Sequence, residues 1–109
     1  MERIYNKLVR DNIPSIIEGN GATPITRILN EKEYKKELEK KLYEEYNEVL
    51  EASGEDRVEE LADMIEVIKY LAKLEGKELG DVIKNADEKS TKRGAFNDKI
   101  FLEKVIEDK

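Results

Sequence analysis

The sequence predicts a mainly all-α protein, an antiparallel helical bundle completed by oligomerisation, with short extended segments near both termini. Apolar residues recur at the helical period over two long stretches, and the dipeptide Ser53-Gly54 separates them. The second stretch is apolar over more of its circumference than one helix can cover, which favours packing against a second subunit. Only 39% of the 109 residues are hydrophobic, which also predicts a small hydrophobic core that is completed by association with other copies.

The elements follow from local signals in chain order. Residues 1–10 lack a helical period and are expected to form an extended lead-in. Asp11 is placed to cap a short helix over Asn12–Glu18, whose first turn tolerates Pro14, and the run 19–21 contains two glycines that end it.

Two segments are candidates for short strands. Residues 22–29 contain the β-branched Ile25, Thr26 and Ile28, which favours a strand or an extended segment. Residues 97–106 alternate loosely between polar and apolar types and are also consistent with a short strand.

Three helices are predicted in the rest of the chain. Asn30 followed by Glu33 has the pattern of a capping box, and a long helix then runs to about Ala52. The next helix runs from about Glu55 to Gly76, and the last from Lys77 or Glu78 to Thr91. Because the Ser53-Gly54 break is short, the two long helices are expected to be antiparallel neighbours.

Composition limits the function. The length predicts one domain spanning residues 1–109. A net charge of -6 disfavours binding to polymeric nucleic acid or to a membrane surface. With no cysteine and no histidine, the chain has no disulfides, thiolate chemistry or histidine triads, and any metal must be bound by oxygen. The absence of a long apolar run predicts a cytoplasmic protein without a signal peptide.

Two pairs of acids stand out because of their apolar surroundings. Glu45 lies within the apolar arc of the first long helix and Glu48 at its edge, and Glu60 and Asp63 have the same relation to the second. An uncompensated carboxylate removed from water costs several kcal/mol, so these acids need a cationic partner, either a metal ion or Lys or Arg.

The alternative is that these pairs belong to solvated helix faces. With 26 acids in the chain, pairs three residues apart are common on such faces. The positions of Glu45 and Glu60 within the apolar stripes favour a site instead. Four neighbouring acids lie off the stripes and are predicted to be surface residues: Glu44, Glu51, Glu59 and Glu66.

The antiparallel arrangement brings the four carboxylates of the two pairs face to face. Such an oxygen donor set suits Mg2+ first and Mn2+ next, and supports hydrolysis at phosphate groups. Glu48 is the candidate general base, and Glu45 is a second candidate catalytic residue. No glycine-rich phosphate loop is present, so four basic residues are the candidates for phosphate contacts: Lys7, Arg10, Lys89 and Arg93. Lys89 and Arg93 are equally explained as favourable charges at a helix C-terminus.

Three blocks carry a resemblance that extends over nearly the whole chain: the opening YNKLVRDNIPSIIEGNG, the acid pairs in LYEEYNEVLEA and VEELADMIEVI, and the closing KSTKRGAF. This arrangement resembles the all-α nucleoside triphosphate pyrophosphohydrolase superfamily, in its MazG-like and phosphoribosyl-ATP pyrophosphohydrolase-like branch. The resemblance implies Mg2+ held by Glu45, Glu48, Glu60 and Asp63 in a homodimer or homotetramer. It implies hydrolysis of a nucleoside triphosphate between its α and β phosphates, giving a nucleoside monophosphate and pyrophosphate.

Several functions remain open at this point. Within the resemblance, clearance of the nucleotide pool ranks above hydrolysis of phosphoribosyl-ATP in histidine biosynthesis, since the LVRDNIP opening looks more like the broad MazG-like group. Outside it, the chain would be a helical partner-binding module whose acids pair with Lys or Arg. A third alternative is a nucleotide sensor that has lost catalysis.

Overall fold

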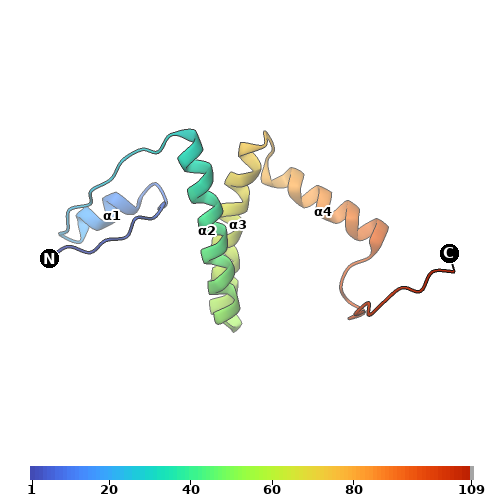
Figure 1. Ribbon diagram of the computed structural model, residues 1–109. Helices are drawn as coiled ribbons and strands as arrows, with labels where there is room; N and C mark the ends of the chain where they lie inside the picture. Colours follow the sequence, from blue (N-terminus) through green and yellow to red (C-terminus); the bar gives the residue numbers. More distant parts are fainter. Residues whose placement is uncertain (109) are drawn as a thin grey trace.

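The computed structural model describes residues 1–108, and its secondary structure is entirely helical (Figure 1). The helices are α1 (Ile13–Gly19), α2 (Glu31–Glu51), α3 (Gly54–Leu74) and α4 (Leu79–Arg93). The predicted all-α class is confirmed. The strand alternative is wrong for residues 22–29, for which an extended segment was also predicted, and for residues 97–106, because both segments lack regular structure. A strand needs a neighbour with which to exchange backbone hydrogen bonds, and neither segment has one within residues 1–108.

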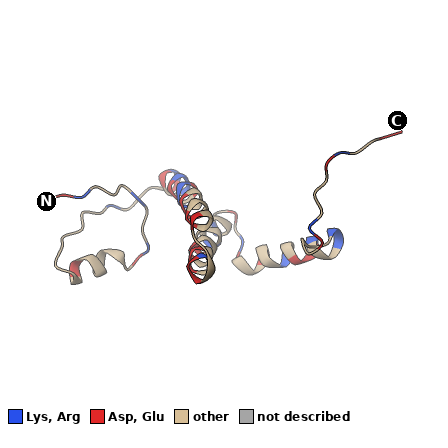
Figure 2. Cartoon of the chain, turned by 90° about the horizontal axis from the view of Figure 1, so that it is seen from below, with Lys and Arg blue, Asp and Glu red and all other residues tan. Residues whose placement is uncertain are grey.

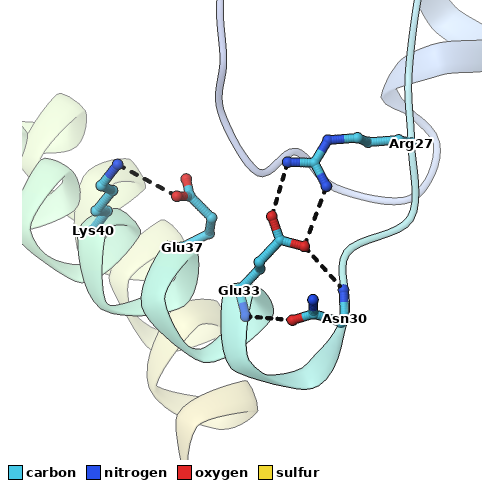
Figure 3. Close-up of polar contacts among 5 residues, drawn as sticks. All are labelled: Arg27, Asn30, Glu33, Glu37 and Lys40. Atoms are coloured by element: carbon cyan, nitrogen blue, oxygen red, sulfur yellow. Dashed lines mark hydrogen bonds and ion pairs between the residues drawn. The ribbon is translucent and has the colours of Figure 1, made fainter.

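The centre of the fold is the antiparallel hairpin of α2 and α3, which lie side by side along their length (Figure 1). The start of α2 is fixed by the predicted capping box. The Asn30 side chain accepts a hydrogen bond from the Glu33 backbone N–H at 2.9 Å, and the Glu33 carboxylate accepts one from the Asn30 N–H at 3.5 Å (Figure 3). Arg27 pairs with the same carboxylate at 2.9 Å. Such a cap contributes about 1 kcal/mol to helix stability.

Arg57 closes the turn between the two long helices. Its Nε donates to the backbone oxygens of Val49 at 3.1 Å and Ala52 at 2.9 Å, which are among the carbonyls that the end of α2 leaves without helical partners. Helix α3 begins at Gly54, one residue before the predicted start, where φ is 59°. The positive φ suits glycine, so the sharp reversal of the chain occurs here without strain.

The chain is far more extended than an isolated domain of its size. Its radius of gyration is 19.1 Å, whereas a compact domain of this length has about 13 Å. Helix α4 leads away from the hairpin and, among the described helices, contacts only α3 (Figure 1). The buried apolar side chains of residues 1–108 are Leu38, Val67 and Ala72. Within residues 1–108, no helix combines the length and the apolar character that crossing a membrane requires.

Candidate metal centre

Glu45 is the buried acid of the hairpin, with only 8% of its surface exposed. It lies two helical turns after Leu38, which is also buried, so the two residues share the stripe of α2 that faces α3. Helix packing therefore removes this carboxylate from water, as its position within the apolar arc predicted. Its Oε2 atom has no hydrogen-bond partner.

Three carboxylates converge between the two helices. One oxygen from each of Glu45, Glu60 and Asp63 lies within 4.8 Å of the others. Glu60 and Asp63 are half-buried and come from consecutive turns of α3, and antiparallel packing sets them opposite Glu45. We refer to these three residues as the acid cluster. Glu48, the fourth predicted acid, is exposed and lies outside this group, although it is the neighbour that most strongly raises the pKa of Glu60.

The crowding of the carboxylates changes their protonation. The hydrogen bond with Glu48, then burial, then the charges of Glu48, Asp63 and Glu45 raise the pKa of Glu60 to about 7. Burial, followed by the negative charges of Glu48 and Asp63, also raises the pKa of Glu45. At neutral pH, Glu60 is therefore close to the midpoint of its titration, and a proton partly compensates the cluster.

The cluster fits a hard divalent cation on the evidence of its own unsatisfied atoms. Glu45 Oε2 and Glu60 Oε2 are both buried and neither has a hydrogen-bond partner. Buried polar atoms without partners are rare in folded proteins, and each such atom calls for an explanation. An oxygen-only set of three converging carboxylates matches the ligand preference of Mg2+ and Mn2+. A cation bound by these residues would satisfy both atoms and relieve the repulsion among the carboxylates, which is one cause of the two raised pKa values.

An open depression of ≈ 350 Å³ adjoins the cluster at Glu48 and Glu60. Its lining residues are Glu48, Glu51, Ala52, Asp56, Glu59 and Glu60. Glu51 and Glu59, predicted to be surface residues, are indeed exposed, yet they lie on the rim of this depression. Because most of the lining is acidic, a phosphate group could approach it only together with cations.

The structure places two of the four predicted phosphate-binding residues against acids. Arg10 Nη2 lies 2.8 Å from Asp63 Oδ1, and Arg10 Nη1 lies 3.8 Å from Glu66 Oε2. Lys7 Nζ lies 3.4 Å from Glu44 Oε1. Sequence reasoning missed these pairs because partners so far apart in the chain, 53 residues for Arg10 and Asp63, leave no local spacing signal.

The other two, Lys89 and Arg93, are in the second half of α4, which makes no contact with α2 in the described part of the chain. Figure 2 shows the basic end of α4 well separated from the acids of the hairpin. Within a single chain, the structure therefore does not bring Lys89 and Arg93 to the acid cluster.

Comparisons with known proteins add one partial similarity. The sequence matches no known protein family and no solved structure. An uncharacterized protein of Mycolicibacterium smegmatis is 44% identical over 50 residues, which are 46% of this chain and 51% of that protein. The chain thus spans about half the length of the curated relative that it matches.

Proposed function

We propose that this protein is a Mg2+-dependent nucleoside triphosphate pyrophosphohydrolase, MazG-like in its reaction, that cleaves between the α and β phosphates. The observation that carries the proposal is the acid cluster, in which Glu45 is almost fully buried and its Oε2 is unpaired. Mn2+ is the alternative cation. The products are a nucleoside monophosphate and pyrophosphate, and we assign the activity to clearance of the cytoplasmic nucleotide pool.

The residues divide into two roles. Glu45, Glu60 and Asp63 hold the cation, and Glu48 completes the set from the edge of the depression. A cation held by these residues would neutralise phosphate charge and lower the pKa of water. Glu48, whose exposed carboxylate adjoins Glu60, accepts the proton of the attacking water. Glu45 supports the reaction from the buried side of the cluster, because helix packing holds its own carboxylate oxygen in place.

We further propose that the protein works as a homodimer or homotetramer. One chain exposes 10353 Å², whereas a compact protein of 12.7 kDa exposes about 6,200 Å². The difference is about 4,100 Å² for each chain, or about 8,200 Å² for a pair of chains, which reaches beyond the roughly 2,000–5,000 Å² typical of obligate interfaces counted over both partners. Association would cover large apolar side chains such as Val58, Ile65 and Ile83. It would also let Lys89 and Arg93 of one copy contact phosphates at the acid cluster of another.

The assembly has a direct test. Sedimentation equilibrium over a wide concentration range is expected to give twice or four times the 12.7 kDa of one chain. A second measurement uses an equimolar mixture of the Glu60→Gln variant and a Lys89→Ala/Arg93→Ala variant. If basic residues act across copies, mixing restores part of the activity that each variant lacks. A monodisperse 12.7 kDa species would contradict the assembly.

The reaction is tested by pyrophosphate release from a panel of ordinary and modified nucleoside triphosphates and phosphoribosyl-ATP, with Mg2+ or with EDTA. Mg2+-dependent pyrophosphate from at least one compound is the expected result. Preference for phosphoribosyl-ATP would assign the protein to histidine biosynthesis. Silence from well-folded protein across the whole panel would contradict the enzyme.

A helical partner-binding module is the second candidate, and the large apolar surface favours it. In that case the oligomeric state and the fold would be indifferent to Mg2+ and EDTA, and no nucleotide would bind. A nucleotide sensor would bind the nucleotide in the presence of Mg2+ without releasing pyrophosphate. Equilibrium binding of a non-hydrolysable nucleotide separates these two outcomes.

A further inference from the structure

The chain before α1 touches the hairpin beside the acid cluster. This segment has no regular structure, and its basic side chains reach acids of both long helices. Arg10 is the residue that reaches the cluster itself, because Asp63 is one of the three converging acids. Its guanidinium donates a hydrogen bond to Asp63 Oδ1 at 2.8 Å, and its other terminal nitrogen lies 3.8 Å from Glu66.

Asp63 needs such a partner to stay in the cluster. Its carboxylate lies within 4.8 Å of oxygens of two other acids, so like-charge repulsion favours rotation of its side chain towards solvent. Asp63 also lies on the more exposed side of the cluster, whereas helix packing buries the Glu45 side chain and fixes its position. A guanidinium is planar and rigid, so it can fix the direction of one carboxylate oxygen and leave the second oxygen free.

We infer that Arg10 is a positioning residue that holds the Asp63 carboxylate in the orientation in which the acid cluster binds a divalent cation. The inference rests on the proposed metal site. It gives the N-terminal segment a role that differs from the phosphate contact predicted from the sequence. Glu66, one turn further along α3, pairs with the same guanidinium and helps to hold Arg10 beside Asp63.

Arg10 also has an effect that opposes metal binding. Arg10 is itself a cation, and its charge beside the cluster repels a metal ion. The side chain is 57% exposed, however, so water and salt screen this repulsion. The hydrogen bond to Asp63 is direct and is not lost to screening in the same way. Outer partners of metal ligands typically change metal affinity 10- to 100-fold, so the positioning effect is the larger.

The experiment is a titration of metal-free protein with Mn2+, followed by electron paramagnetic resonance, for the wild type and for Arg10→Gln and Arg10→Lys. Arg10→Gln is expected to weaken Mn2+ binding about 10-fold, within the range for outer partners of metal ligands. Arg10→Lys is expected to retain part of the affinity, because a lysine can still donate to Asp63. Circular dichroism should show the same helical content in all three proteins, since Arg10 lies outside the helices.

Arg27→Gln is the matched control. Arg27 also lies in a segment without regular structure and pairs with an acid, since its Nη2 is 2.9 Å from Glu33 Oε2. This pair is at the start of α2 and outside the acid cluster. The Mn2+ affinity of Arg27→Gln should equal that of the wild type. Unchanged or tighter binding by Arg10→Gln, with normal binding by the wild type, would overturn the positioning role alone. Failure of the wild type to bind Mn2+ would overturn the metal site and this role together.

Discussion

Replacing Glu45 or Glu60 by glutamine is expected to abolish Mg2+-dependent pyrophosphate release while the helical content of the protein stays unchanged. Each carboxylate supplies one of the three converging oxygens, and both have a buried oxygen without a partner. Glutamine keeps the shape of the side chain but removes the negative charge. Because loss of an outer partner alone costs 10- to 100-fold in metal affinity, loss of a ligand should weaken Mn2+ binding at least about 100-fold.

The same variants should tolerate the absence of metal better than the wild type. Removing one charge from a crowded set of acids lowers the repulsion that adds to the effect of burial on the pKa values of Glu45 and Glu60. In EDTA at pH 8, the melting temperature of each variant should therefore equal or exceed that of the wild type. This combination of lost activity and retained stability separates a ligand from a residue needed for folding.

Glu39→Gln is the control for the charge change. Glu39 is an exposed acid of the same helix as Glu45 and lies outside the cluster. Its Mn2+ affinity and turnover should match those of the wild type. If Glu45→Gln and Glu60→Gln turn over as fast as this control, the acid cluster is not the site of the reaction.

The stability of the metal-free protein should fall as the pH rises from about 4.5 to about 7. The pKa of Glu60 is raised from its usual 4.5 to about 7, so in this window the folded protein holds a proton that the unfolded chain has released. The unfolding free energy then decreases with pH, and the loss is complete above pH 7. The raised pKa of Glu45 acts in the same direction.

Mg2+ should reverse this trend. A cation binds the ionised cluster and competes with the proton on Glu60, so its affinity rises as the pH approaches and passes 7. Because a ligand of the folded state raises the apparent stability, the melting temperature in Mg2+ should be higher at pH 8 than at pH 5.5. Melting curves in EDTA and in Mg2+ across pH 5 to 8, at one fixed protein concentration, make the comparison.

Glu60→Gln provides the control, because it removes the carboxyl group whose pKa is raised to about 7. The fall in melting temperature in EDTA between pH 5 and pH 8 should be smaller in this variant than in the wild type. Glu33, whose pKa is lowered by its hydrogen bond with Arg27, contributes stability that is lost only as the pH falls below the window. If the melting temperature of the metal-free protein rises from pH 5 to pH 8, Glu60 does not hold a proton in the folded state as predicted.

Local chemistry explains how much of the helical structure the sequence could predict. The Asn30 capping box is a contact between residues three positions apart, so its pattern is visible in the sequence and the start of α2 was predicted correctly. The break before α3 was visible for a similar reason, because its residues favour a chain reversal. Periodicity likewise placed Glu45 on the buried stripe of α2, which the structure confirms.

The predictions that failed or were missing concern partners distant in sequence. Residues 22–29 have strand-like composition but no neighbouring strand, so their composition alone could not form a sheet. Nothing near Arg10 in the sequence indicates that its guanidinium lies against Asp63. The direction of α4, which separates Lys89 and Arg93 from the acid cluster of their own chain, depends on packing after α3 ends.

The sequence by itself therefore determined the four helices, the buried stripe and the acids on it, because hydrogen bonds and side-chain periodicity within a helix are local. Of the four acids that the sequence predicted to face one another, only the tertiary structure decided that Glu60 and Asp63 converge on Glu45 while Glu48 stays outside, and that Arg10 pairs with Asp63. Those contacts depend on how two helices and a preceding segment pack in space. Packing is a property of surfaces that meet, and no single stretch of the chain encodes it.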